Sequence, residues 1–261
     1  MWEVVLPLLG FLIGIVAAMT GVGGGIFIVP LLTLVFGFVP AHAVGTSLAV
    51  IVFTAVAASF GYWRQKLVFF RAGLLLAVAT VPGSVLGAYL TSVLSPAVLG
   101  LVFGVFLVVV AVRMVFESTA FRGKKGSGRS LVVSEEALFA DKRRLSVGVG
   151  LSFFGGVASG LLGIGGGVLL VPIMALILLL PMHVVVATSM LTMILTSVAG
   201  AAQHYVQGNI DFAYALLLAV GAVVGAQVGA YISGKLSGRN LRRIFAVVLL
   251  IVSVQMIIKF V

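Results

Sequence analysis

Long apolar segments separated by short polar linkers occupy nearly the whole chain. Because a helix needs roughly 20 apolar residues to cross about 30 Å of hydrocarbon, most of these segments are candidate transmembrane helices. The segments are 4–20, 26–38, 43–62, 72–92, 97–116, 145–162, 168–180, 184–203, 212–233 and 241–260. Two of them, 26–38 and 168–180, are short, which leaves open whether they span the membrane or re-enter it. Apolar and polar residues do not alternate along the segments, so we expect helices and not a β-barrel.

The sequence also contains an internal repeat. The stretch Gly14–Gly25 recurs as Gly156–Gly167, 142 residues further on. The same offset relates several polar and glycine positions: Pro30 and Pro172, Thr46-Ser47 and Thr188-Ser189, Gln65 and Gln207, and Gly83–Tyr89 and Gly225–Tyr231. Because apolar runs alone do not keep one offset at polar positions, we predict a duplication. The first half is then 1–117, the linker 118–144, and the second half 145–261.

The basic residues orient each half, since Lys and Arg concentrate on the cytoplasmic side of a membrane. Linker 63–71 carries three basic residues, whereas its equivalent 205–212 carries none. Conversely, 93–96 is uncharged and its equivalent 234–243 carries four. Equivalent linkers therefore fall on opposite sides, which predicts inverted-topology halves, a cytoplasmic central linker and both termini outside. A parallel duplication with a weak charge bias is the alternative.

The expected fold class is therefore an all-α polytopic membrane protein. It has two inverted-topology repeats and about 8–10 membrane segments, with broken or re-entrant helices at the glycine-rich motifs. The central linker, rich in Gly, Ser, Lys and Arg, is expected to be a flexible tether with a short interfacial helix at 134–141. The chain is expected to cross its membrane several times.

Composition narrows the function classes. With 62% hydrophobic and 8% charged residues, the chain lacks the surface of an ordinary soluble protein. The net charge of +10 lies in short linkers, which favours lipid headgroup contacts and not nucleic acid. There is no cysteine, and we expect no catalytic residue, metal or cofactor. The carboxylates lie at the ends of the chain or in linkers: Glu3, Glu117, Glu135, Glu136, Asp141 and Asp211. Without a carboxylate at membrane depth, a small anion is a better substrate than a cation.

The two glycine motifs, Gly21-Val-Gly-Gly-Gly25 and Gly163-Ile-Gly-Gly-Gly167, interrupt apolar segments. Such runs disfavour continuous helix, and amide N–H groups ahead of a new helix can hold an anion without a charged side chain. Close helix packing is the alternative explanation. The predicted substrate-binding residues of the motifs are Gly21, Gly23, Gly24, Gly25 and Ile26, and Gly163, Gly165, Gly166, Gly167 and Val168.

Hydroxyl and aromatic residues add further candidates. Thr46, Ser47, Thr188 and Ser189 either donate to a substrate oxygen or bond within their own helices, and both options stay open. Glycines at 83–87 and 225–229 lie inside long apolar segments, which predicts helix packing. Two equivalent groups near segment ends are typical of an aromatic belt, with a gating role as the alternative: Tyr62, Trp63 and Gln65, and His204, Tyr205 and Gln207.

The duplicated Gly-x-Gly-Gly-Gly-x-x-x-x-Pro element, at Gly21–Pro30 and Gly163–Pro172, resembles the TauE/SafE sulfite exporter family. The Thr-Ser that follows each copy strengthens the resemblance, which covers the chain apart from 117–144. It implies a multi-pass permease of the plasma (inner) membrane. Such a permease moves small sulfur-containing anions such as sulfite or organosulfonates, often outward, and the resemblance does not fix which one. The expected partners are that anion and membrane lipids, and homo-oligomer formation is left open.

Other functions stay open at this point. A passive anion channel or a permease for another small anion is the alternative within transport. A membrane-embedded enzyme would need clustered nucleophiles, bases or metal ligands, and the three histidines are scattered. A membrane scaffold would leave the two glycine motifs unexplained. We therefore expect alternating-access transport with the site where the two halves meet.

Overall fold

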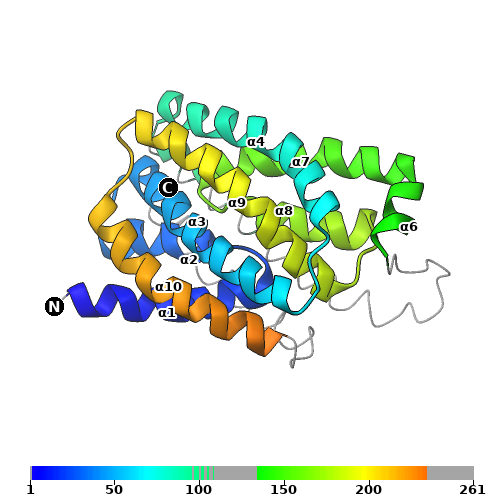
Figure 1. The fold of residues 1–261 in the computed structure, drawn as a ribbon. Helices are drawn as coiled ribbons and strands as arrows, with labels where there is room; N and C mark the ends of the chain where they lie inside the picture. Colours follow the sequence, from blue (N-terminus) through cyan, green and yellow to red (C-terminus); the bar gives the residue numbers. More distant parts are fainter. Residues whose placement is uncertain are drawn as a thin grey trace.

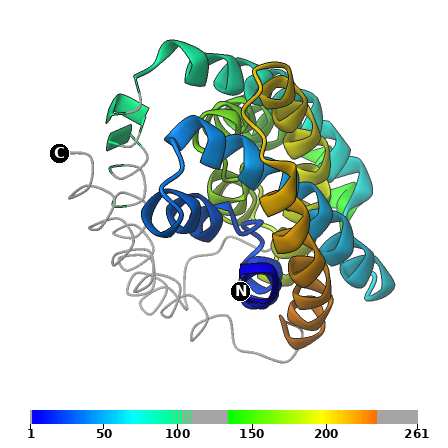
Figure 2. The same ribbon diagram turned by 90° about the vertical axis from the view of Figure 1, so that its left-hand side faces the viewer.

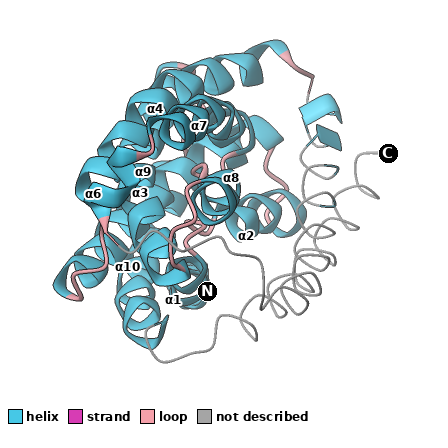
Figure 3. Ribbon diagram, turned by 90° about the vertical axis from the view of Figure 1, so that its right-hand side faces the viewer, coloured by secondary structure: helices cyan, strands magenta, loops and turns pink. Residues whose placement is uncertain are grey.

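The computed structural model describes residues 2–95, 97–99, 101, 102, 105, 108 and 134–233. These residues form helices and loops without a strand (Figure 3). The predicted segment 241–260, the basic linker 234–243, most of 97–116 and most of the central linker lie outside the described residues.

Each half contributes a similar series of helices. The first half has α1 (Trp2–Thr20), α2 (Gly25–Pro30), the π-helix η1 (Leu31–Val35), α3 (Pro40–Arg64) and α4 (Phe70–Val93). After the short helix α6 (Glu135–Ala140), the second half has α7 (Lys142–Leu162), α8 (Gly167–Pro172), the π-helix η2 (Ile173–Ile177), α9 (Met182–Val206) and α10 (Phe212–Ser233). Five of these helices, α3, α4, α7, α9 and α10, are long and apolar enough to cross a membrane. The prediction of an all-α polytopic membrane protein is therefore confirmed.

The short segments are helical but too short to cross a membrane alone. The apolar helical runs are Gly25–Val35 and Gly167–Ile177. At 1.5 Å per residue each run reaches about 16 Å, roughly half the thickness of the hydrocarbon core. The backbone then turns back into α3 and α9, which begin at Pro40 and Met182.

The first helix of each half packs on the last described helix of the other half. Figure 1 shows α1 beside α10 and α4 beside α7, and Figure 2 gives the end view. The long helices α3 and α9 contact each other, and each also contacts one of these pairs: α3 contacts α10, and α9 contacts α4. When the halves are exchanged by the 142-residue offset, α1–α10 becomes α7–α4 and the pattern of contacts is unchanged. The observed packing follows the repeat seen in the sequence.

Glycines allow these helix pairs to approach closely. A Cβ atom built on Gly87 of α4 would meet the backbone oxygen of Val157 in α7. At the equivalent position, a Cβ on Gly229 of α10 would meet the backbone oxygen of Ile15 in α1. Since the obstructing atoms are backbone, no side chain can rotate away. The predicted packing role of 83–87 and 225–229 is confirmed.

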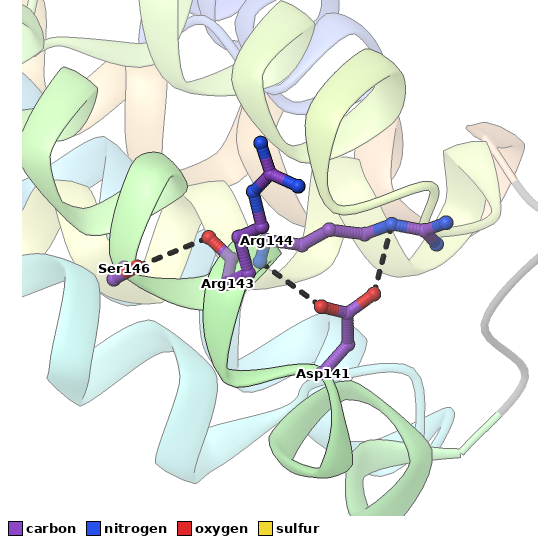
Figure 4. A network of polar contacts seen from close by, with 4 residues as sticks. All are labelled: Asp141, Arg143, Arg144 and Ser146. Carbon is purple, nitrogen blue, oxygen red and sulfur yellow. Dashed lines mark hydrogen bonds and ion pairs between the residues drawn. The ribbon is translucent and has the colours of Figure 1, made fainter.

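Polar caps position the short helix at the end of the central linker and the start of α7. Ser134 Oγ accepts from Ala137 N at 3.2 Å, so the predicted short helix near 134–141 is confirmed as α6. Asp141 then caps α7: its carboxylate accepts from Arg144 N at 3.1 Å and pairs with Arg144 Nε at 2.9 Å (Figure 4). Glu135 Oε1 accepts from Ala72 N at 2.8 Å, which ties α6 to the start of α4 in the first half.

Two of the predicted belt residues are buried. Tyr62 is 1% exposed and its hydroxyl donates to Ala18 O at 2.7 Å, and His204 is 0% exposed with Nε2 3.0 Å from Gly160 O. Both carbonyls lie in the last turn of a helix, where they lack intrahelical donors. The belt prediction is wrong for this pair because a phenol or an imidazole can satisfy such a carbonyl. Their neighbours Trp63 and Tyr205 are exposed, as expected of belt residues.

Candidate functional site

Both glycine motifs break the helix in the same way. α1 ends at Thr20 and α2 begins at Gly25, with Gly24 as its N-cap at φ 91°. The second motif repeats this geometry, with Gly166 as the N-cap of α8 at φ 84°. Only glycine adopts these left-handed angles without steric cost. The predicted helix breaks are therefore confirmed at both motifs.

The two motifs lie directly against each other. A Cβ atom built on Gly25 would meet the backbone oxygen of Gly163, and its distance to Ile164 Cα would be 2.7 Å. In the equivalent contact, a Cβ on Gly167 would lie 2.5 Å from Gly21 O and 2.7 Å from Val22 Cα. α2 and α8 accordingly lie near one another in Figure 3. The fold thus brings the motif residues predicted from the sequence into one buried region formed by both halves.

Two buried side chains fill the space between the motifs. Met193 Cε would lie 2.5 Å from a Cβ atom built on Gly165, and it would also clash with a Cβ atom built on Gly23. Ile51 Cγ2 would lie 3.0 Å and 3.1 Å from the same two positions. Ile51 and Met193 are equivalent in the repeat, and both are 0% exposed. Sequence reasoning missed this pair, because an aliphatic residue inside an apolar helix carries no signal that distinguishes it from its neighbours.

The serines of the Thr-Ser pairs connect each half to the opposite motif. Ser47 Oγ donates to Gly163 O at 2.8 Å, and Ser189 Oγ donates to Gly21 O at 2.9 Å. Ser189 Oγ also lies 2.9 Å from Val186 O in its own helix. These two bonds are equivalent under the repeat. Both serines are 0% exposed, so the bonds are shielded from water. In this conformation the serine hydroxyls hold the motifs together.

The threonines make a second equivalent pair of bonds. Thr46 Oγ1 accepts from Asp211 N at 3.0 Å, and Thr188 Oγ1 accepts from Phe69 N at 3.1 Å. The two donors lie just before α10 and α4, in loops of the opposite half. All four hydroxyls predicted as site residues are therefore bonded to backbone across the boundary between the halves.

The motifs offer neutral hydrogen-bond donors. The first bond in α2 runs from Phe27 N to Gly24 O at 2.9 Å, so the N–H groups of Gly25 and Ile26 lie ahead of the bonded ladder. In α8 the first bond runs from Leu169 N to Gly166 O at 3.1 Å, which leaves Gly167 and Val168 in the same position. Among the described residues, no buried side chain is Asp, Glu, Lys or Arg. In the same part of the chain, no group of His, Asp or Glu is arranged to hold a metal ion. The chemistry of this region is that of dipolar donors, which suits a small anion.

Comparison with known proteins agrees with this architecture. The family model of the sulfite exporter TauE/SafE matches residues 6–256. The probable membrane transporter protein YunE of Bacillus subtilis (strain 168) is 35% identical, and the match covers 97% of each chain. A probable membrane transporter protein of Methanocaldococcus jannaschii is 28% identical over 82% of this chain and 81% of its own. No solved structure matches the chain. The chain is a multi-pass membrane transporter and belongs to the TauE/SafE sulfite exporter family.

Proposed function

We propose that this chain is a secondary transporter that exports a small sulfur-containing anion, of the sulfite or organosulfonate class, by alternating access between two inverted halves. The observation that carries the proposal is the meeting of two equivalent glycine motifs in one buried region lined by neutral donors. Family membership supports the substrate class. Broken backbone at membrane depth is tolerated where it faces protein or a substrate path, which fits a transport site.

The inverted arrangement rests on the charge pattern. Basic residues mark 63–71 but not 205–212, which places these equivalent linkers on opposite sides. The proposed halves are 1–117 and 145–261. They pack against each other through the contacts of α1 with α10 and of α7 with α4. With the linker 118–144 in the cytoplasm, both termini lie outside the plasma membrane. Two halves of opposite orientation around one site are an arrangement that recurs among alternating-access transporters.

The proposed substrate ligands are the backbone N–H groups of both motifs and the hydroxyls of the Thr-Ser pairs. The motif residues are Gly21, Gly23, Gly24, Gly25, Ile26, Gly163, Gly165, Gly166, Gly167 and Val168, and the hydroxyls are those of Thr46, Ser47, Thr188 and Ser189. In the described conformation the serines donate to carbonyls of the opposite motif. When the motifs separate, these donors become available to an anion oxygen. The same event requires Ile51 and Met193 to move, because they occupy the space between Gly23 and Gly165.

The test is uptake of radiolabelled sulfite into proteoliposomes that contain the purified chain. Unlabelled sulfite, thiosulfate, sulfate, a sulfonate and chloride serve as competitors under imposed pH and voltage gradients. We expect saturable uptake that particular sulfur anions block, with counterflow from preloaded vesicles. Flux that neither saturates nor shows counterflow would indicate a passive anion channel. Uptake equal to that of protein-free vesicles would contradict the proposed substrate class.

A further inference from the structure

Buried hydroxyls in this protein generally bond to a backbone carbonyl one turn earlier. Thr33 donates to Val29 O at 2.9 Å, Thr54 to Val50 O at 3.0 Å, and Ser152 to Gly148 O at 2.7 Å. Ser159 and Ser197 differ: both are 0% exposed, yet neither hydroxyl has a hydrogen-bond partner within the described residues.

Both unpartnered serines lie beside the second glycine motif. Ser197 Oγ, on α9, would lie 3.3 Å from a Cβ atom built on Gly165. Ser159, in the last turn of α7, places its own Cβ 3.5 Å from a Cβ built on Gly166. Two helices therefore place one serine with an unpartnered hydroxyl each beside adjacent residues of the same motif. Ser59 also lacks a partner, but it lies alone among apolar side chains beside Phe60 and Trp63.

The first motif lacks these hydroxyls. The residues equivalent to Ser159 and Ser197 are Ala17 and Ala55. Ala17 occupies the corresponding place, with its Cβ 3.2 Å from a Cβ built on Gly24. Alanine therefore satisfies the packing at this position of the repeat. A hydroxyl buried without a partner costs about 1–3 kcal/mol, so packing does not explain why two of them flank only the second motif.

We propose that Ser159 and Ser197 are substrate-binding residues that make the second motif the anion subsite of the transporter. This inference rests on the proposed function and adds to it that the second motif supplies two substrate donors that the first motif lacks. Two O–H donors beside Gly165 and Gly166 are suited to two oxygens of one small oxyanion, such as the sulfite or sulfonate group. Charge-assisted bonds of this kind are about twice as strong as bonds between neutral groups.

The test compares Ser159→Ala and Ser197→Ala with Ser152→Ala, a control on α7 whose hydroxyl bonds to its own helix. One measurement is the KM for radiolabelled sulfite in proteoliposomes. The other is the midpoint of thermal unfolding with and without sulfite. We expect the first two variants to raise KM about tenfold each and to lose most of the stabilisation by sulfite. Their midpoints without sulfite should equal or exceed that of the wild type, because an unpaired hydroxyl is removed. The control should keep the wild-type KM.

The outcomes separate this inference from the proposed function. Saturable wild-type uptake with an unchanged KM in both serine variants would overturn the anion subsite and leave the transporter proposal standing. A lowered midpoint without sulfite, together with full stabilisation by sulfite, would assign the serines a structural role and also overturn it. If the wild type shows no saturable uptake of any sulfur anion, the proposed function fails and the subsite fails with it.

Discussion

The contact between α4 and α7 predicts that two alanine substitutions on one helix have opposite effects on stability. Gly156 faces α4 so closely that an added Cβ would meet Thr80 O, with Thr80 C and Cα each at 2.8 Å. Gly150, six residues earlier on the same helix, has nothing within 4 Å of an added Cβ. Gly150→Ala is therefore a matched control for Gly156→Ala.

The expected magnitude follows from two terms. Replacing Gly by Ala inside a helix contributes about 0.5–1 kcal/mol in favour of folding at either position. At Gly156 the new methyl group also overlaps backbone atoms, and such overpacking costs about 1–3 kcal/mol. The first term cancels between the two variants. Since about 1 kcal/mol shifts the melting midpoint by about 2–4 °C in a chain of this size, Gly156→Ala should melt about 2–12 °C below Gly150→Ala.

The assay is heating of the detergent-solubilised protein followed by size-exclusion chromatography of the fraction that stays monodisperse. All variants are heated for the same time, because unfolding of such proteins is irreversible and the midpoint depends on rate. Gly14→Ala extends the test to the other half, since its Cβ would meet Ala222 O with Ala222 Cα at 2.8 Å. A midpoint for Gly156→Ala at or above that of Gly150→Ala would refute the close α4–α7 contact.

Three further predictions concern the site and the topology. Gly24→Leu should abolish sulfite uptake without preventing membrane insertion, as uptake assays and membrane fractionation would show. Gly24 has φ 91°, and an added Cβ would lie 2.9 Å from Ile13 Cγ2. Ser47→Ala and Ser189→Ala should each lower stability by about 1–3 kcal/mol, since each leaves an equivalent buried carbonyl unpaired; strongly unequal melting midpoints would contradict this. Trp63→Cys and Tyr205→Cys, in a chain without native cysteine, should react with an impermeant maleimide from opposite sides; labelling from one side would rule out inversion.

Features that depend on local sequence could be predicted well. The helical class, the breaks at Gly21–Gly25 and Gly163–Gly167 and the packing glycines were all visible, because each depends on hydropathy, glycine content or spacing. The offset of 142 residues also indicated which positions are equivalent. The inverted orientation stays a prediction, since one of the basic linkers on which it depends, 234–243, lies outside the described residues.

Features that depend on which groups face each other could not be predicted. A serine hydroxyl in a helix can bond to its own backbone or to a neighbour, and the sequence does not distinguish the two. The structure shows the second option for Ser47, whose partner Gly163 O lies in the other half. Tyr62 was misplaced for a related reason. Its position near a helix end suggested the membrane interface. In the structure its hydroxyl donates to Ala18 O, which has no donor within α1 because that helix ends at Thr20.

The pairing of equivalent bonds indicates how this conformation relates to transport. Gln65 Nε2 donates to Ala230 O at 3.1 Å, and Gln207 Nε2 donates to Ala88 O at 2.9 Å, which adds a third equivalent pair to those of the serines and threonines. Both members of each pair are formed together, so under the proposed alternating access this conformation would be a closed state between two open ones. Under the same proposal, opening towards one side would break one member of each pair, at about 0.5–1.5 kcal/mol per bond. A cost of a few kcal/mol is within the range that differential substrate binding can supply. Equal losses of stability in Ser47→Ala and Ser189→Ala would fit this balance, whereas strongly unequal losses would contradict it.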